Sequence, residues 1–138
     1  MNHLVFLDTR AGELERILSG VKSMVVRELG PARPAAHPVR PGDSLYFLRD
    51  NGEYAVRVQA AVLRVLPAMD SLDLPHTLKE MQPRLQLTES QYNCWSGKKQ
   101  VLLVEFTAAH KIPVIHVASN KLPDRSDWIA FKEFSLIT

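Results

Sequence analysis

Residues 44–66 read SLYFLRDNGEYAVRVQAAVLRVL, two runs of strand-forming residues separated by Asp50-Asn51-Gly52. Asn-Gly between apolar runs is a strong hairpin signal, because both residues tolerate the positive φ of a tight turn. In the second run, valine and alanine largely alternate with polar residues, which indicates a strand with one buried face. We therefore expect adjacent antiparallel strands at Ser44–Arg49 and Tyr54–Leu66, the second interrupted by a bulge before Arg64.

The segments on either side of this hairpin predict further strands and helices. Apolar and branched runs indicate strands at His3–Leu7, Lys22–Arg27, Val101–Phe106, Ile112–Val117 and Trp128–Phe134. Helical spacing and capping residues indicate helices from Asp8 or Thr9 to Ser19, which Gly20 can end, and over Leu72–Met81 and Thr88–Trp95. Strands and helices do not alternate regularly, so we expect an α+β fold with a small barrel-like sheet of about five to seven strands and two or three flanking helices.

The composition is that of one globular domain over residues 1–138, with 46% hydrophobic and 23% charged residues. A single cysteine, Cys94, excludes an intramolecular disulfide and a multi-cysteine zinc site, and we expect it to be a buried, inert thiol. The longest apolar runs fall far below the roughly 20 residues of a membrane span, and the N-terminus reads as a strand rather than a cleavable signal. We therefore expect a cytoplasmic protein with no membrane partner.

Metal and cofactor signals are absent from the sequence pattern. The histidines share no helical i, i+4 spacing, so we predict no metal and no cofactor and expect ordinary surface or strand residues at His3, His37, His76, His110 and His116. The net charge is only +2, but residues 22–64 carry a basic excess that can attract phosphate. Residues 30–41 form a proline-rich loop, and loops of this length are often functional.

Residues 18–27, LSGVKSMVVR, resemble the signature of ASCH domains, which belong to the PUA-like group of small β-barrels associated with RNA. The shared pattern is a helix ending in Gly20, followed by Lys22 and Arg27. The resemblance continues through the Pro-Gly-Asp turn at 41–43 and the segment WSGKK at 95–99, and it covers about residues 3–108. It leaves residues 109–138 as an extension and implies a PUA-like barrel with an RNA or nucleotide-like ligand.

The resemblance also identifies a departure at Val25. ASCH-type enzymes that hydrolyse acetylated cytidine use a lysine, a threonine and a downstream glutamate. Lys22 matches the lysine, Val25 stands at a position where other members carry glutamate or threonine, and no downstream glutamate aligns. We therefore expect negligible hydrolysis of acetylated cytidine, and Lys22 is the best candidate for a catalytic residue if the protein is an enzyme.

Two segments supply the candidate binding residues. Lys22 and Arg27 offer an ammonium and a guanidinium, although five residues of flat strand would place them on opposite faces. The segment 92–99 combines Tyr92 and Trp95 with Lys98 and Lys99, a mixture that suits single-stranded nucleic acid because rings stack on bases while lysines neutralise phosphates. The alternative is that Tyr92 and Trp95, three residues apart, pack the helix onto the sheet.

We therefore predict an RNA-binding or nucleotide-binding protein with a basic cleft between Lys22–Arg27, the 30–41 loop and the 92–99 segment. Two alternatives remain open at this point. The first alternative is an enzyme that acts on RNA or a modified nucleoside, similar to a ribonuclease or an amidohydrolase. The second is a protein-interaction module that uses the 30–41 loop. The oligomeric state is also open.

Overall fold

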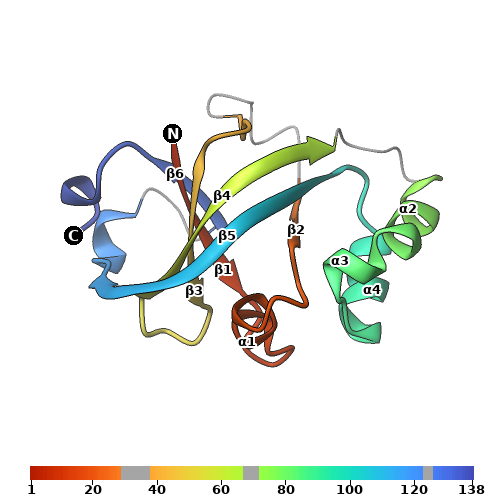
Figure 1. Cartoon of the computed structure of the whole chain (residues 1–138), viewed down its shortest axis with the longest axis horizontal. Coiled ribbons are helices and arrows are strands. Elements are labelled where there is room, and N and C mark those ends of the chain that lie inside the picture. Colours follow the sequence, from red (N-terminus) through yellow and green to blue (C-terminus); the bar gives the residue numbers. More distant parts are fainter. Residues whose placement is uncertain (29–37, 67–71, 123–125) are drawn as a thin grey trace.

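The computed structural model describes residues 1–28, 38–66, 72–122 and 126–138, so most of the proline-rich loop, including His37, lies outside the described residues. A curled six-stranded sheet dominates the described residues, with the strand order β2-β5-β4-β3-β1-β6 (Figure 1). Its strands are β1 (Asn2–Leu7), β2 (Met24–Glu28), β3 (Ser44–Arg49), β4 (Ala55–Leu66), β5 (Val101–His116) and β6 (Trp128–Phe131). The α+β fold with a small barrel-like sheet is confirmed.

The sheet is half a barrel, because β2 and β6 end the strand order and do not pair with each other. β1 and β3 are parallel, while the other described neighbours are antiparallel. The side chains of the two edge strands nevertheless meet, since the Arg27 guanidinium lies 5.3 Å from the centre of the Trp128 ring. We call this opening between β2 and β6 the seam.

The predicted strands at 44–66 are adjacent and antiparallel, as expected, but their turn is not tight. Pairing runs from Ser44 opposite Ala61 to Phe47 opposite Val58, so the connection is longer than a two-residue hairpin. Within this connection Asn51 Oδ1 accepts a hydrogen bond from the Glu53 N–H at 3.1 Å, an Asx turn. The expected bulge before Arg64 is confirmed by a register shift at that point.

The two strands expected at Val101–Phe106 and Ile112–Val117 are one strand, β5. Ala108 has a positive φ of 57°, and the register against β4 shifts along the pair. These irregularities bend β5 without ending it, because β4 is long enough to pair with both halves. The apolar pattern predicted both halves of β5 but not that they form one continuous strand.

The first helix is shorter than predicted. The Asp8 carboxylate accepts hydrogen bonds from the N–H groups of Arg10 and Ala11, which makes a turn, and Gly12 follows with a φ of 64°. Helix α1 (Glu13–Leu18) begins only after that turn. Gly20 adopts a φ of 84° just beyond its end, as the sequence indicated.

Helices α2, α3 and α4 gather at one end of the sheet (Figure 1). Helix α4 (Glu89–Ser96) begins at the predicted cap, where Thr88 and Gln91 form a reciprocal capping box. The other described helices are α2 (Leu74–Glu80), the unpredicted α3 (Gln82–Leu85) and two short 3-10 turns, Ser119–Lys121 and Phe134–Leu136. In the parts of the chain that the structure describes, no helix is long and apolar enough to cross a membrane.

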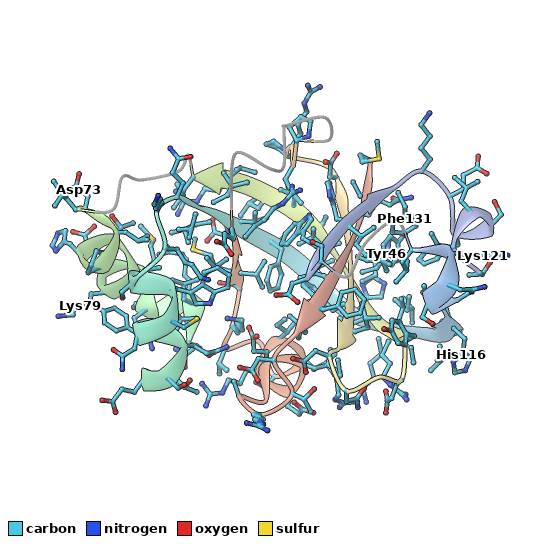
Figure 2. All side chains as sticks on the ribbon, turned by 180° about the vertical axis from the view of Figure 1, so that it is seen from behind. Tyr46, Asp73, Lys79, His116, Lys121 and Phe131 are labelled. Atoms are coloured by element: carbon cyan, nitrogen blue, oxygen red, sulfur yellow. The ribbon has the colours of Figure 1, made fainter. Side chains whose placement is uncertain are left out.

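Apolar packing holds the helices where they are. Leu14 and Ile17 of α1 pack with Phe47 and Phe106 against one face of the sheet. Leucines of α2 and α3 pack with Met24 of β2, which holds the helical group beside that edge strand. The opposite end of the molecule carries an aromatic cluster that includes Tyr46 and Phe131, seen in Figure 2 far from Lys79 of α2. Because the packing against Met24 holds the helices beside β2, α4 lies beside the seam.

Candidate functional site

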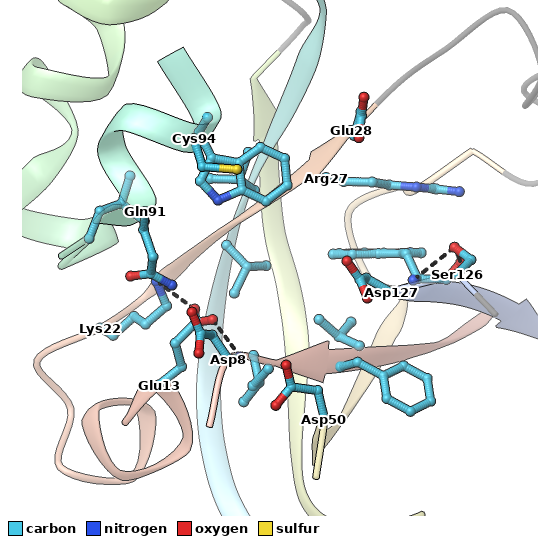
Figure 3. A pocket seen from close by; sticks show the side chains of 18 of the residues that line it. Asp8, Glu13, Lys22, Arg27, Glu28, Asp50, Gln91, Cys94, Ser126 and Asp127 are labelled. Atoms are coloured by element: carbon cyan, nitrogen blue, oxygen red, sulfur yellow. Dashed lines mark hydrogen bonds and ion pairs between the residues drawn. The ribbon is translucent and has the colours of Figure 1, made fainter. Parts of the chain in front are cut away.

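A pocket of about 430 Å³ lies at the seam. Its walls come from the ends of β1 and β2, from one face of α4 and from residues 126–128 (Figure 3). Helix α4 forms one side of the pocket, and the edge strands β2 and β6 with the adjacent β1 form the other. The lining includes Lys22 at one end of the pocket and Trp128 at the other, and a buried basic side chain lies at or behind each of them, Lys22 itself and His3 behind Trp128.

Lys22 lies at the first end with only 1% of its surface exposed. Its Nζ donates a hydrogen bond to the Leu85 carbonyl oxygen and lies 3.2 Å from Glu13 Oε2. Burial lowers the pKa of Lys22, although the adjacent Glu13 carboxylate opposes that change. An ammonium has three donors, and these contacts use two of them.

Glu13 was not singled out by the sequence, yet it organises this end. Its Oε1 accepts a hydrogen bond from the Asp8 N–H at 2.8 Å while its Oε2 faces Lys22. Lys22 precedes the first residue of β2, so the alternation of a strand does not apply to it. The condition under which Lys22 and Arg27 would lie on opposite faces, one flat strand, is therefore not met, and both residues line the pocket.

Trp128 lies at the second end, between Arg27 and His3. Its Nε1 donates a hydrogen bond to His3 Nδ1 at 3.1 Å, and His3 Nε2 lies 2.8 Å from Asp43 Oδ2. His3 is a residue of β1, one of the two alternatives expected for it, and it is completely buried rather than on the surface. Burial lowers the pKa of His3, and the hydrogen bond to Asp43 opposes that change.

Helix α4 contributes Ser90, Gln91, Cys94 and Trp95 to the wall. Cys94 is exposed, which corrects the expectation of a buried thiol, because one turn of α4 presents it to the pocket rather than to the core. Trp95 packs against the helical core, as the packing alternative predicted, and it also lines the pocket.

The remaining candidates of the 92–99 segment are not among the described residues that line the pocket. The Tyr92 hydroxyl donates to the Pro75 carbonyl oxygen at 3.2 Å, and Lys79 lies 5.9 Å from its ring centre, so Tyr92 ties α4 to α2. Lys98 lies 3.6 Å from Glu28, a residue of the pocket rim, whereas Lys99 is exposed. The structure thus brings Lys22, Arg27 and Trp95 together.

The pocket lining is acidic rather than basic, which corrects the expected basic cleft. Two cations, Lys22 and Arg27, face five carboxylates among the described lining residues: Asp8, Glu13, Glu28, Asp50 and Asp127. Among the ion pairs of the described residues, Glu13 contacts Lys22 and Glu28 contacts Lys98.

Three of these acids converge because of the strand topology. Asp8 directly follows β1 and Asp50 directly follows β3, and these parallel strands pair Leu7 with Arg49. Asp127 directly precedes β6, which is antiparallel to β1, so it reaches the same edge of the sheet. An acid at each strand end was visible in the sequence, but the parallel pairing that gathers them was not.

A second cavity of about 570 Å³ adjoins this edge. Phe6, Asp50, Ser126 and Asp127 line both cavities, so the edge forms a shared wall. Within the described residues, no group of three or more histidine, cysteine, aspartate or glutamate side chains is arranged to hold a metal ion.

These features define a small α+β half-barrel with a ligand-sized pocket at its open seam. Solved structures of an ASCH protein from Zymomonas mobilis are similar to this chain over nearly its whole length. One point mutant of that protein, ZmASCH, has a TM-score of 0.70 at 14% identity, covering 96% of this chain and 91% of its own. The structure titled ASCH from Zymomonas mobilis has a TM-score of 0.69 at 15% identity, covering 97% and 90%.

The chain therefore has the ASCH-domain fold, which confirms the fold implied by the sequence resemblance. No protein-family model matches the chain, and no curated protein matches it either. At this level of identity the likeness concerns the fold.

Proposed function

We propose that this protein binds a nucleoside-type ligand, a single base with its ribose, in the pocket at the seam. The observation that supports this proposal best is a pair of tryptophans, Trp95 and Trp128, in the wall of a 430 Å³ pocket rich in hydrogen-bond acceptors. Aromatic walls hold flat bases by stacking, and unstacked bases of single-stranded RNA are recognised in this way. The volume lies within the usual range for small-ligand sites.

The charge of the lining supports a base rather than a phosphate inside the pocket. Carboxylates such as Asp8 and Asp50 accept hydrogen bonds from the exocyclic amino groups of bases but repel phosphate oxygens. Lys98 contacts Glu28 at the rim, and Lys99 follows it. In this proposal the base enters the pocket while any phosphates of an RNA strand stay outside, near these lysines. Such ligands are present in the cytoplasm, where we expect the protein to act.

A second candidate function is hydrolysis of a modified nucleoside or of RNA, and the Lys22–Glu13 pair favours it. A buried ammonium next to a carboxylate can hold and move a proton in a pocket. Val25 also lines the pocket without a hydroxyl or carboxylate, so hydrolysis of acetylated cytidine should be negligible. Incubation with acetylated cytidine and detection by mass tests this, and turnover that disappears in Lys22→Ala would contradict the expectation.

Binding is tested by titrating cytidine, adenosine and a short single-stranded RNA against the full chain. Trp95→Ala should weaken the binding of all three by about 1–3 kcal/mol, because a stacking partner is lost. Leu136→Ala is the matched control, since Leu136 is an exposed apolar residue outside the pocket lining. Thermal melting first establishes that Trp95→Ala is folded. If neither the nucleosides nor the RNA bind at low salt, the proposal is wrong.

A further inference from the structure

We propose that His3, held by Asp43, is a positioning residue that sets the orientation of the Trp128 ring in the pocket wall. The part of this proposal that concerns ligand binding rests on the proposed function. The part that concerns Trp128 rests on the geometry of the described residues alone. His3 contacts no ligand in this proposal; it acts through Trp128.

The contacts form a line from the turn before β3 to the seam. Asp43 Oδ2 lies 2.8 Å from His3 Nε2, and Trp128 Nε1 lies 3.1 Å from His3 Nδ1. The far side of the Trp128 ring faces Arg27, whose guanidinium carbon is 5.3 Å from the ring centre. The line therefore joins β1, β6 and β2 at the seam, where β2 and β6 do not pair with each other.

The chemistry of the three side chains determines the tautomer of His3. An indole nitrogen can only donate, so His3 Nδ1 must carry the lone pair that accepts from Trp128. Nε2 then carries the proton and donates it to Asp43. If Nδ1 gained a proton, two N–H groups would face each other and Trp128 would lose its acceptor inside the protein.

The charged groups around His3 act in both directions. Asp43 favours the protonated ring, whereas burial, Arg27 and the α-amino group of Met1 disfavour it, and the net effect lowers the pKa of His3. Burial would raise the pKa of Asp43, but its hydrogen bonds with His3, the Arg40 N–H and the Met1 amino group lower it instead. At neutral pH, His3 is therefore neutral and available as an acceptor, and acidification removes that acceptor.

The backbone of Trp128 is held separately from its ring. Ser126 Oγ accepts a hydrogen bond from the Trp128 N–H at 3.1 Å and donates one to the Trp128 carbonyl oxygen at 2.9 Å. Loss of the His3 contact should accordingly release the indole ring while β6 stays in register. A released ring would change both the stack with Arg27 and the wall that the ligand meets.

The experiment follows the indole N–H resonance of Trp128 by NMR, with Trp95→Phe used to assign it. Two variants separate the two contacts of His3. His3→Asn places an amide near the position of Nδ1 and can accept from Trp128 without titrating. His3→Gln places its amide near Nε2, which retains the contact with Asp43 and loses the one with Trp128.

We expect the wild-type resonance to shift between pH 8 and 5 with a midpoint below 6.5, the ordinary pKa of histidine. His3→Asn should keep the resonance near its pH 8 position at every pH, and His3→Gln should displace it at every pH. Cytidine and adenosine should bind His3→Gln about 5- to 150-fold more weakly than wild type, equivalent to one lost stacking contact.

The outcomes distinguish this proposal from the proposed function. A pH-independent resonance that His3→Gln leaves in place would overturn the role of His3, whether or not nucleosides bind. A Trp128 resonance that follows pH and is displaced in His3→Gln, in a protein that binds neither nucleoside, would instead contradict the proposed function. Should His3→Gln fail to fold, the pH series of wild type against His3→Asn still decides the question.

Discussion

The two ends of the pocket are built differently. At the first end, Lys22 and Glu13 come from neighbouring elements and hold each other by charge. At the second end, neutral hydrogen bonds join Trp128 to His3, which Asp43 holds in turn, and the chain brings these residues from three distant places. Burial lowers the pKa of Lys22 and of His3, and a carboxylate opposes the change in both cases, but Lys22 acts as a charged donor to Glu13 whereas His3 accepts from Trp128 through a lone pair. Removing a residue should therefore cost more at the first end.

Lys22→Met should have the largest effect on stability. It removes the counter-ion of Glu13 and the donor to the Leu85 carbonyl, and breaking a buried pair from one side typically costs about 3–5 kcal/mol. Glu13 is partly exposed, so we expect the lower part of that range. Urea denaturation measures the free energy of unfolding. The double variant Glu13→Gln/Lys22→Met should recover part of the lost free energy of unfolding. A loss below about 1 kcal/mol in Lys22→Met would show that the ion pair does not stabilise the fold.

Trp128→Phe tests the second end and should have a smaller effect. The ring remains apolar, but His3 Nδ1 loses its donor, and a buried acceptor without a partner costs about 1–3 kcal/mol. The same denaturation series measures this loss. Trp95→Phe is the matched control, because no hydrogen bond of its indole nitrogen is described. Equal losses in the two variants would remove the distinction between Trp128 and an ordinary packed tryptophan.

Acidification should weaken the second end selectively. Since the pKa of His3 is lowered in the folded state, the unfolded chain binds more protons below pH 6.5, and the free energy of unfolding falls as the pH falls through that window. Thermal melting of wild type and His3→Asn at pH 7.5 and pH 5.5 measures the difference. The wild type should lose more stability between these pH values than His3→Asn, and identical losses in both would assign the acid sensitivity to other groups.

Lys98→Ala/Lys99→Ala should have the smallest effect, because these lysines belong to neither end of the pocket. Stability should change by no more than about 0.5 kcal/mol, as for other exposed positions. If RNA phosphates lie at the rim, each lost contact should reduce the slope of log affinity against log salt by about 0.7. Titration of single-stranded RNA at several salt concentrations measures the slope. An unchanged slope would place the strand elsewhere on the surface.

The contrast between local and distant contacts also separates the site residues that the sequence predicted from those that it did not. Lys22 and Arg27 were found from a local pattern and do line the pocket, because the short connection from α1 to β2 leaves them little freedom. Tyr92 carried the same kind of sequence signal as Trp95, yet it holds α2 and α4 together. A helix face can be identified from spacing, but which neighbour covers each turn of it depends on packing between distant segments.

Local chemistry in the chain already indicated where the strand segments lie, the capping box of α4 and the glycine after α1, because alternation, side-chain caps and positive φ act over a few residues. The acidic edge formed by Asp8, Asp50 and Asp127 arose only when β1 paired in parallel with β3 and antiparallel with β6. The burial of His3 arose in the same step. Such pairings join residues up to 129 positions apart, as Asn2 and Phe131 are, and no local pattern encodes them.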